Sequence, residues 1–198
     1  MIFASAVRRS HRVHRARVLT ALVVVALGAA TWALSGCEAL DSAGGSGPWP
    51  IGVRYLDQPF GTHSGSLSSG APMDLSFAAQ ASMACFPAPA NGWYGGNHVL
   101  YGFSVPAGTP ITVRAIPGAG QDLSLYGYSL GATRYDTPPT VQSAVSCEAS
   151  PSSSSNPNGP DVAEQIHFSS SANPYNFLIG VAAPAGISGS YTLQIVAQ

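Results

Sequence analysis

The sequence contains no lysine, and charged residues make up only 9% of its 198 residues. The short motifs that carry common enzyme chemistry are also missing: there is no phosphate-binding loop, no Rossmann glycine fingerprint and no motif of paired carboxylates. His63, His98 and His167 are isolated, since none has a second histidine two or four positions away, as a metal-binding pair would. These absences argue against catalytic, cofactor-binding and metal-binding sites, and the sequence predicts none of the three.

The N-terminal segment has the three parts of an export signal. Residues 1–17 carry five of the eight basic residues, all arginine, and no acidic residue, and an apolar run follows over residues 18–33. The run ends at Leu34-Ser35-Gly36-Cys37, an aliphatic residue and two small ones before a cysteine. This tetrapeptide resembles the lipobox of bacterial lipoproteins. The resemblance implies that residues 1–36 are a helical signal peptide that is cleaved off, and that Cys37 carries lipid with acyl chains such as palmitate.

The alternative is an uncleaved membrane anchor, because residues 18–36 form a run of 19 residues, just long enough to cross a bilayer. No basic cluster follows the run, however, and the next residues are Glu38-Ala39-Leu40-Asp41. Two or three acyl chains also anchor a protein stably where one would not. We therefore expect a lipid-anchored protein on the exported side of the bacterial cell envelope, in the outer membrane if the cell is Gram-negative.

Cleavage before Cys37 would leave residues 37–198, a length that fits one domain. Three arginines would remain against nine acidic residues, a formal net charge of −6. A surface of that charge is a poor partner for nucleic acid. The expected partners are the membrane, through Cys37, and an envelope protein or polysaccharide.

Cys85 and Cys147 remain once Cys37 carries lipid. Two cysteines in an exported domain most often pair, so we expect a disulfide between them. Closing this loop of roughly 62 residues would contribute about 4 kcal/mol on the chain-entropy model. The alternative is a redox or catalytic thiol, but no CxxC motif occurs and no cationic neighbour stands beside either cysteine to lower its thiol pKa.

Residues 37–50 form a tether rich in Gly and Ser, and residues 51–198 have the pattern of a single β-domain. About nine short segments alternate apolar and polar residues between Gly/Pro turns, which predicts strands. They lie at residues 51–56, 73–79, 98–105, 111–113, 123–126, 141–147, 162–168, 175–181 and 191–196. The intervening residues 61–70, 87–96 and 135–160 read as loops, of which the last holds the segment at 141–147. With no helix expected after the signal, the pattern predicts an all-β fold, an antiparallel β-sandwich.

Several segments of the C-terminal half follow a familiar order. They are Tyr101-Gly-Phe-Ser-Val-Pro-Ala-Gly108, Ile111-Thr-Val113, Asp122-Leu-Ser-Leu-Tyr126, Glu164-Gln-Ile-His-Phe168, Tyr175-Asn-Phe-Leu-Ile-Gly-Val181 and Gly189-Ser-Tyr-Thr-Leu-Gln-Ile195. In this order they resemble the bacterial pre-peptidase C-terminal domain over residues 98–197. The resemblance implies a jelly-roll-like accessory module, and some such modules resemble collagen- or carbohydrate-binding modules that carry calcium. Because Ser124 replaces the second carboxylate of the family's Asp-x-Asp-Leu-Tyr pattern, the sequence does not predict calcium near Asp122.

Four aromatic residues form a candidate ligand surface. Trp93 and Tyr94 lie in a Gly-rich loop, and Tyr126 and Tyr128 share one strand face, opposite the neighbouring leucines. Exposed aromatic rings bind sugars or proteins through an apolar face with polar edges. The alternative is that these rings cover the core or an edge of the sandwich.

The sequence favours a non-enzymatic lipoprotein that displays its β-sandwich at the cell envelope for interaction or assembly. The alternative is a glycan- or protein-binding accessory module that works with a separate secreted enzyme. A hydrolase is a more distant reading: Gly61-Thr-His63-Ser64-Gly65 superficially resembles a nucleophile turn, but it is not G-x-S-x-G and no helix is expected after it.

Overall fold

The structure is a computed structural model that describes residues 48–76, 92–141, 146–147, 159–169 and 171–198. These residues form ten strands and short 3-10 turns such as η1 (Leu67–Ser69), and they contain no helix long and apolar enough to cross a membrane. Cys37, Cys85 and the side chain of Cys147 lie outside the described residues, as do residues 1–47. Lipidation, signal cleavage and the disulfide therefore stay predictions.

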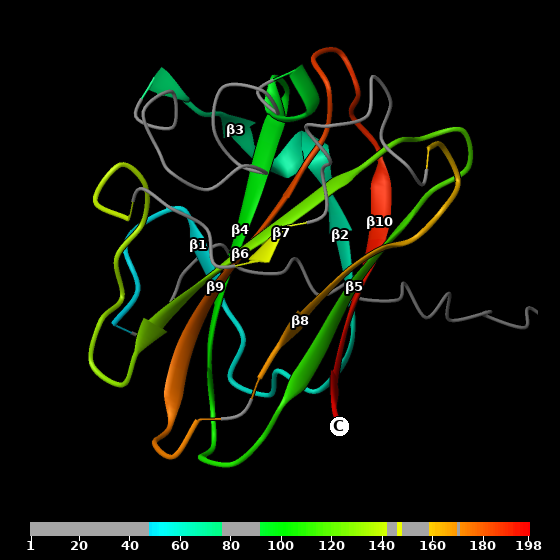
Figure 1. The fold of residues 1–198 in the computed structure, drawn as a ribbon. Helices are drawn as coiled ribbons and strands as arrows, with labels where there is room; N and C mark the ends of the chain where they lie inside the picture. Colours follow the sequence, from blue (N-terminus) through cyan, green and yellow to red (C-terminus); the bar gives the residue numbers. More distant parts are fainter. Residues whose placement is uncertain (1–47, 77–91, 142–145, 148–158, 170) are drawn as a thin grey trace, which may run out of the picture. The chain divides into compact units, whose positions relative to one another are not determined.

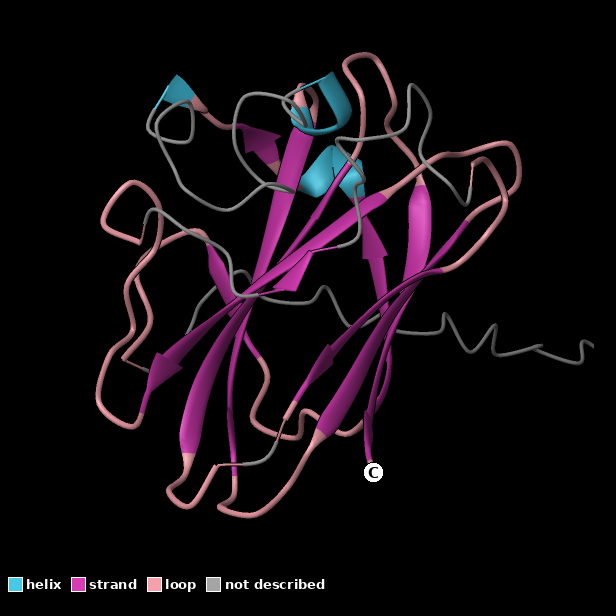
Figure 2. Cartoon of the chain, in the orientation of Figure 1, coloured by secondary structure: helices cyan, strands magenta, loops and turns pink. Residues whose placement is uncertain are grey.

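The strands form two sheets (Figures 1 and 2). The six-stranded sheet has the order β1 (Val53–Tyr55), β4 (Asn97–Val105), β9 (Tyr175–Ala182), β6 (Ser124–Gly131) and β7 (Ser146–Cys147), and β3 (Ala71–Pro72) also pairs with β4. The four-stranded sheet has the order β2 (Gly61–Ser66), β10 (Ser190–Ala197), β5 (Ile111–Pro117) and β8 (Glu164–Phe168). The all-β antiparallel sandwich is confirmed, with one difference: β1 and β4 run parallel.

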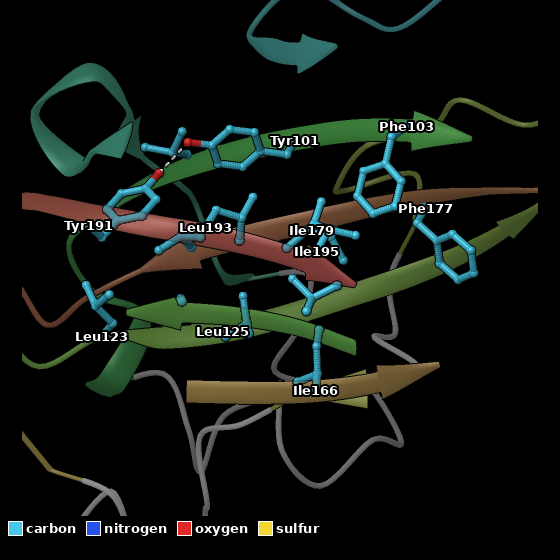
Figure 3. Close-up of a cluster of buried hydrophobic side chains, with 14 of the residues drawn as sticks. Tyr101, Phe103, Leu123, Leu125, Ile166, Phe177, Ile179, Tyr191, Leu193 and Ile195 are labelled. Carbon is cyan, nitrogen blue, oxygen red and sulfur yellow. Dashed lines mark hydrogen bonds between the residues drawn. The ribbon is translucent and has the colours of Figure 1, made fainter. Parts of the chain in front are cut away.

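The apolar residues that alternate along the strands meet between the sheets (Figure 3). Tyr101 of β4 and Tyr191 of β10 come from opposite sheets, and their hydroxyl oxygens lie 2.9 Å apart in a hydrogen bond. Burial raises the pKa of the Tyr191 hydroxyl, so this group keeps its proton and its capacity to donate. The two rings therefore join the sheets by a polar contact inside an apolar core.

Residues 61–66 form strand β2, where the sequence predicted a loop. The prediction was wrong because β2 is an edge strand of small and polar residues, which shows no apolar alternation. Its Gly65 lies opposite Tyr191, and a Cβ at this glycine would lie 2.5 Å from the Tyr191 ring. The composition that resembles a loop therefore makes room for the tyrosine pair.

Two other predicted strands differ from the structure. Residues 73–76 lie after β3 and are not in a strand, while the rest of the segment at 73–79 lies outside the described residues. Within the predicted segment at 141–147, the strand that the structure describes is β7, which has two residues and pairs with β6.

Candidate functional site

The outer face of the six-stranded sheet, the face turned away from the four-stranded sheet, carries a second buried cluster, rich in aromatic rings. Its buried members are Trp49, Val53, Tyr94, Tyr126, Tyr128, Leu130, Leu178 and Ala182, and Trp93 packs against it half-buried. Tyr94 and Tyr126 are 0% exposed and Tyr128 is 1% exposed. The prediction that these three tyrosines present an exposed ligand surface is therefore wrong. The alternation of side chains along the strand correctly placed Tyr126 and Tyr128 on the face opposite Leu125, but other parts of the chain cover that face.

Trp49, which the sequence placed in the tether at residues 37–50, contributes to this cover, so the predicted end of that tether was wrong. The indole ring of Trp49 lies directly on the backbone of Gly102 in β4, where a Cβ would overlap the ring. The same indole meets the ring of Tyr135 edge to face, with the centroids 5.3 Å apart. The cluster therefore depends on a glycine in the middle of a strand, a position where a side chain would keep the tryptophan out.

His98, on the same face of β4, is 5% exposed and uses both ring nitrogens. Its Nε2 lies 2.7 Å from the Tyr94 carbonyl oxygen, which only accepts, so Nε2 carries the proton and donates. Its Nδ1, 2.8 Å from the Tyr126 hydroxyl, then accepts. Burial lowers the pKa of His98 and raises the pKa of Tyr126, so both side chains are neutral around pH 7. This histidine is a structural member of the cluster.

The other two described histidines are also hydrogen-bonded to neutral groups. Nε2 of His63 lies 2.9 Å from the Pro59 carbonyl oxygen. Ser64, the next residue on β2, projects from the opposite face of the strand, so the structure does not bring this hydroxyl and the His63 ring together. His167 Nδ1 lies 2.9 Å from the Thr112 hydroxyl.

The described residues contain no group of three or more His, Cys, Asp or Glu side chains arranged to hold a metal ion. Asp122 therefore belongs to no such group among the described residues. The residue types that bind transition metals or calcium are therefore spread over the described structure rather than gathered.

A cleft of about 330 Å³ opens beside β1, with a charged side chain among its lining residues. Arg54 lines it and donates from Nη2 to the Ser69 hydroxyl at 2.6 Å, while its guanidinium carbon lies 5.9 Å from the centre of the Tyr101 ring. Ile51 and Met73 add apolar lining. The cleft can therefore take a small group that combines negative charge with an apolar part. No local pattern in the sequence marks this cleft, because its lining comes from separate segments.

No protein-family model and no curated protein matches this sequence. Solved structures similar to the chain include the pre-peptidase C-terminal domain of a collagenase from Bacillus anthracis. It has 12% identity and a TM-score of 0.39, and the match covers 77% of this chain and 100% of that one. Another is CorA, a surface-associated copper-binding protein of Methylomicrobium album BG8, with 10% identity, a TM-score of 0.39 and coverage of 73% and 96%. The first belongs to the family whose motifs the C-terminal half resembles. At these TM-scores neither likeness carries an argument about function.

Proposed function

We propose that this chain is a bacterial lipoprotein, held by lipid on Cys37 at the exported side of the membrane, that displays a non-catalytic β-sandwich for interaction or assembly. The observation that carries the proposal is the position of Trp49. This residue is 7% exposed on the sheet and stands only 12 positions after Cys37. The folded part thus begins where the Gly/Ser segment ends, and the segment can span roughly 40 Å when extended.

The use of the described polar groups supports a binding role rather than a catalytic one. None of the three described histidines is hydrogen-bonded to a carboxylate, the group that orients the general base in a catalytic triad; their partners are carbonyl, hydroxyl and amide groups. The cleft at Arg54 offers a charged donor in a concave setting. Its described lining residues include one histidine, His98, and this side chain is buried, so it is not a solvent-accessible general base. This cleft also favours the second candidate function, an accessory module that binds a glycan or protein beside a separate secreted enzyme.

Metabolic labelling with an alkyne fatty acid tests the lipid anchor. We expect label on the wild type, no label on a Cys37→Ala variant, and full label on a Cys85→Ala control. Since lipidation precedes cleavage, the Cys37→Ala chain should also keep residues 1–36 and migrate more slowly on a gel. Equal labelling of the wild type and Cys37→Ala, or equal migration of the two, would refute the anchor.

A further inference from the structure

Side chains on the outer face of the four-stranded sheet, the face turned away from the core, form a row across all four strands. The register places Thr62 opposite Gln194, Gln194 opposite Arg114, and Arg114 opposite Gln165. Directly opposite residues of antiparallel strands project from the same face, and Leu193 on the other face of β10 is fully buried in the core. With strands about 4.8 Å apart, the row is about 14 Å long.

Arg114 is the one permanently charged side chain among the strand residues of this outer face. The flanking strand positions are Ser64, Thr192 and Ile116 on one side and Thr112, His167 and Val196 on the other. None of these described positions is acidic, although the chain without its signal carries a formal net charge of −6. The face therefore differs in charge from the protein that carries it.

The guanidinium of Arg114 is not neutralised by the described part of the chain. Arg114 is half-buried, and its Nε is shielded from solvent without a hydrogen-bond partner among the described residues. Arg134, by contrast, pairs with Asp136 at 2.5 Å. A partly desolvated cation without a counter-ion attracts an incoming carboxylate more strongly than a fully solvated one does.

The polar groups beside Arg114 are held in place before any ligand arrives. The Gln165 amide nitrogen lies 2.8 Å from His167 Nε2, and His167 Nδ1 lies 2.9 Å from the Thr112 hydroxyl. The amide of Gln198 donates to the same hydroxyl. Side chains fixed in this way lose little conformational freedom on binding.

A hollow of about 290 Å³ lies next to the row. Ile116, which is 37% exposed, and Pro117 give it apolar walls, and Ser64, Ser190 and Thr192 add hydroxyl groups. A sugar ring has the matching surface, with C–H groups on its faces and hydroxyls along its edges. Ile116 is two residues from Arg114 on β5, a separation of about 7 Å, so one polymer can reach the hollow and the arginine together.

We propose that this outer face binds an acidic polysaccharide, with a carboxylate on Arg114 and a sugar ring in the hollow beside Ile116. The inference rests on the proposed function, since it names a ligand class for the displayed sandwich. A neutral glycan could accept a hydrogen bond from Arg114 through its hydroxyl oxygens, but it carries no negative charge to pair with the guanidinium. An acidic peptide such as polyglutamate would supply a carboxylate to Arg114, but it has no ring to lie in the hollow beside Ile116.

The test uses the lipidated, processed protein in detergent, with polygalacturonate as the acidic glycan, dextran as the neutral glycan and polyglutamate as the acidic peptide. Affinity electrophoresis and titration calorimetry should show binding to polygalacturonate that weakens with added salt, and none to dextran. Arg114→Gln should weaken binding about tenfold, as the loss of one charge-assisted hydrogen bond does. Arg134→Gln, which removes an arginine already paired, should bind as the wild type does.

Ile116→Asp is the second variant, because this exposed position tolerates a polar side chain and a carboxylate there should repel the polymer. It should also weaken binding about tenfold or more. No binding of polygalacturonate, wild-type affinity in Ile116→Asp, or wild-type affinity in a folded Arg114→Gln would overturn the inference. Polyglutamate binding as tightly as polygalacturonate would assign the face to an acidic peptide instead. Fatty-acid labelling is independent of these assays, so a labelled protein that does not bind polygalacturonate refutes this inference and leaves the anchor standing.

Discussion

Replacing Trp49 by alanine should destabilise the domain strongly, while the same change at Ile51 should not. Both residues are large and apolar, and they stand two positions apart near the start of the described part of the chain. The structure distinguishes them sharply: Trp49 is 7% exposed and packs on β4, whereas Ile51 is 107% exposed. Ile51→Ala is therefore a matched control that removes apolar surface without removing buried contacts.

The expected magnitude follows from the burial of the indole. Truncating a buried tryptophan to alanine costs about 3–5 kcal/mol. For a domain of this length each kcal/mol lowers the melting temperature by about 2–4 °C, so Trp49→Ala should lower it by roughly 6–20 °C. Ile51→Ala should change the free energy of unfolding by about 0.5 kcal/mol or less.

Gly102 adds a second, sharper measurement. A Cβ at this position would overlap the Trp49 ring, so Gly102→Ala alone should cost about 1–3 kcal/mol through overpacking. In a Trp49→Ala background the ring is gone, and the extra methyl group should cost almost nothing. The double-mutant cycle should therefore give a coupling energy of about 1–3 kcal/mol.

Urea unfolding followed by circular dichroism gives the four free energies of this cycle, and differential scanning calorimetry gives the melting temperatures. Additive costs for Trp49→Ala and Gly102→Ala would show that the indole does not lie on that glycine. Equal melting shifts for Trp49→Ala and Ile51→Ala would refute the buried cluster on the outer face of the six-stranded sheet.

Three further predictions use other parts of the molecule. Burial lowers the folded-state pKa of His98 below its ordinary value of 6.5, so the full stability should be present above pH 6.5 and should fall as the pH drops below it. The His98→Gln variant should show a weaker dependence of the melting temperature on pH between about pH 7.5 and 5.5. Gly180→Ala should destabilise the fold by about 1–3 kcal/mol in urea unfolding, since a Cβ there would overlap the Tyr126 ring; an unchanged midpoint would contradict this packing. Alkylation without reductant, read by mass spectrometry, should modify neither Cys85 nor Cys147, and two modified thiols would rule out the predicted disulfide.

The strands of the main core could be read from the sequence because apolar residues alternate along the side of each strand that faces the core. On β4 the apolar residues at 99, 101, 103 and 105 all face the core, so every second residue of this stretch is apolar without interruption. Edge strand β2 could not be read in this way, since Gly65 is selected by the space that Tyr191 needs. Tyr126 shows a third case: periodicity gave its face correctly, but only the folded chain shows that this face is covered.

The two candidate binding surfaces were outside the reach of sequence reasoning for a topological reason. Strand β10, the last in the chain, inserts between β2 and β5, and this brings Thr62, Gln194 and Arg114 side by side. Nothing local to any of the three residues marks it as a member of a row. Similarly, the cleft at Arg54 joins β1 to Ser69 and to the start of β4, and only the pairing of the strands creates it.

The parallel pairing of β1 with β4 has a mechanical consequence. β1 pairs with β4 through three residues, whereas β9 contacts β4 through eight, and β1 is the first strand after the tether. A pull transmitted along the N-terminal segment would load Trp49 and this short pairing before it reached the strands that hold the two sheets together. The pairing of β1 with β4 would then yield first, and the two sheets could remain folded while β1 and Trp49 pulled away.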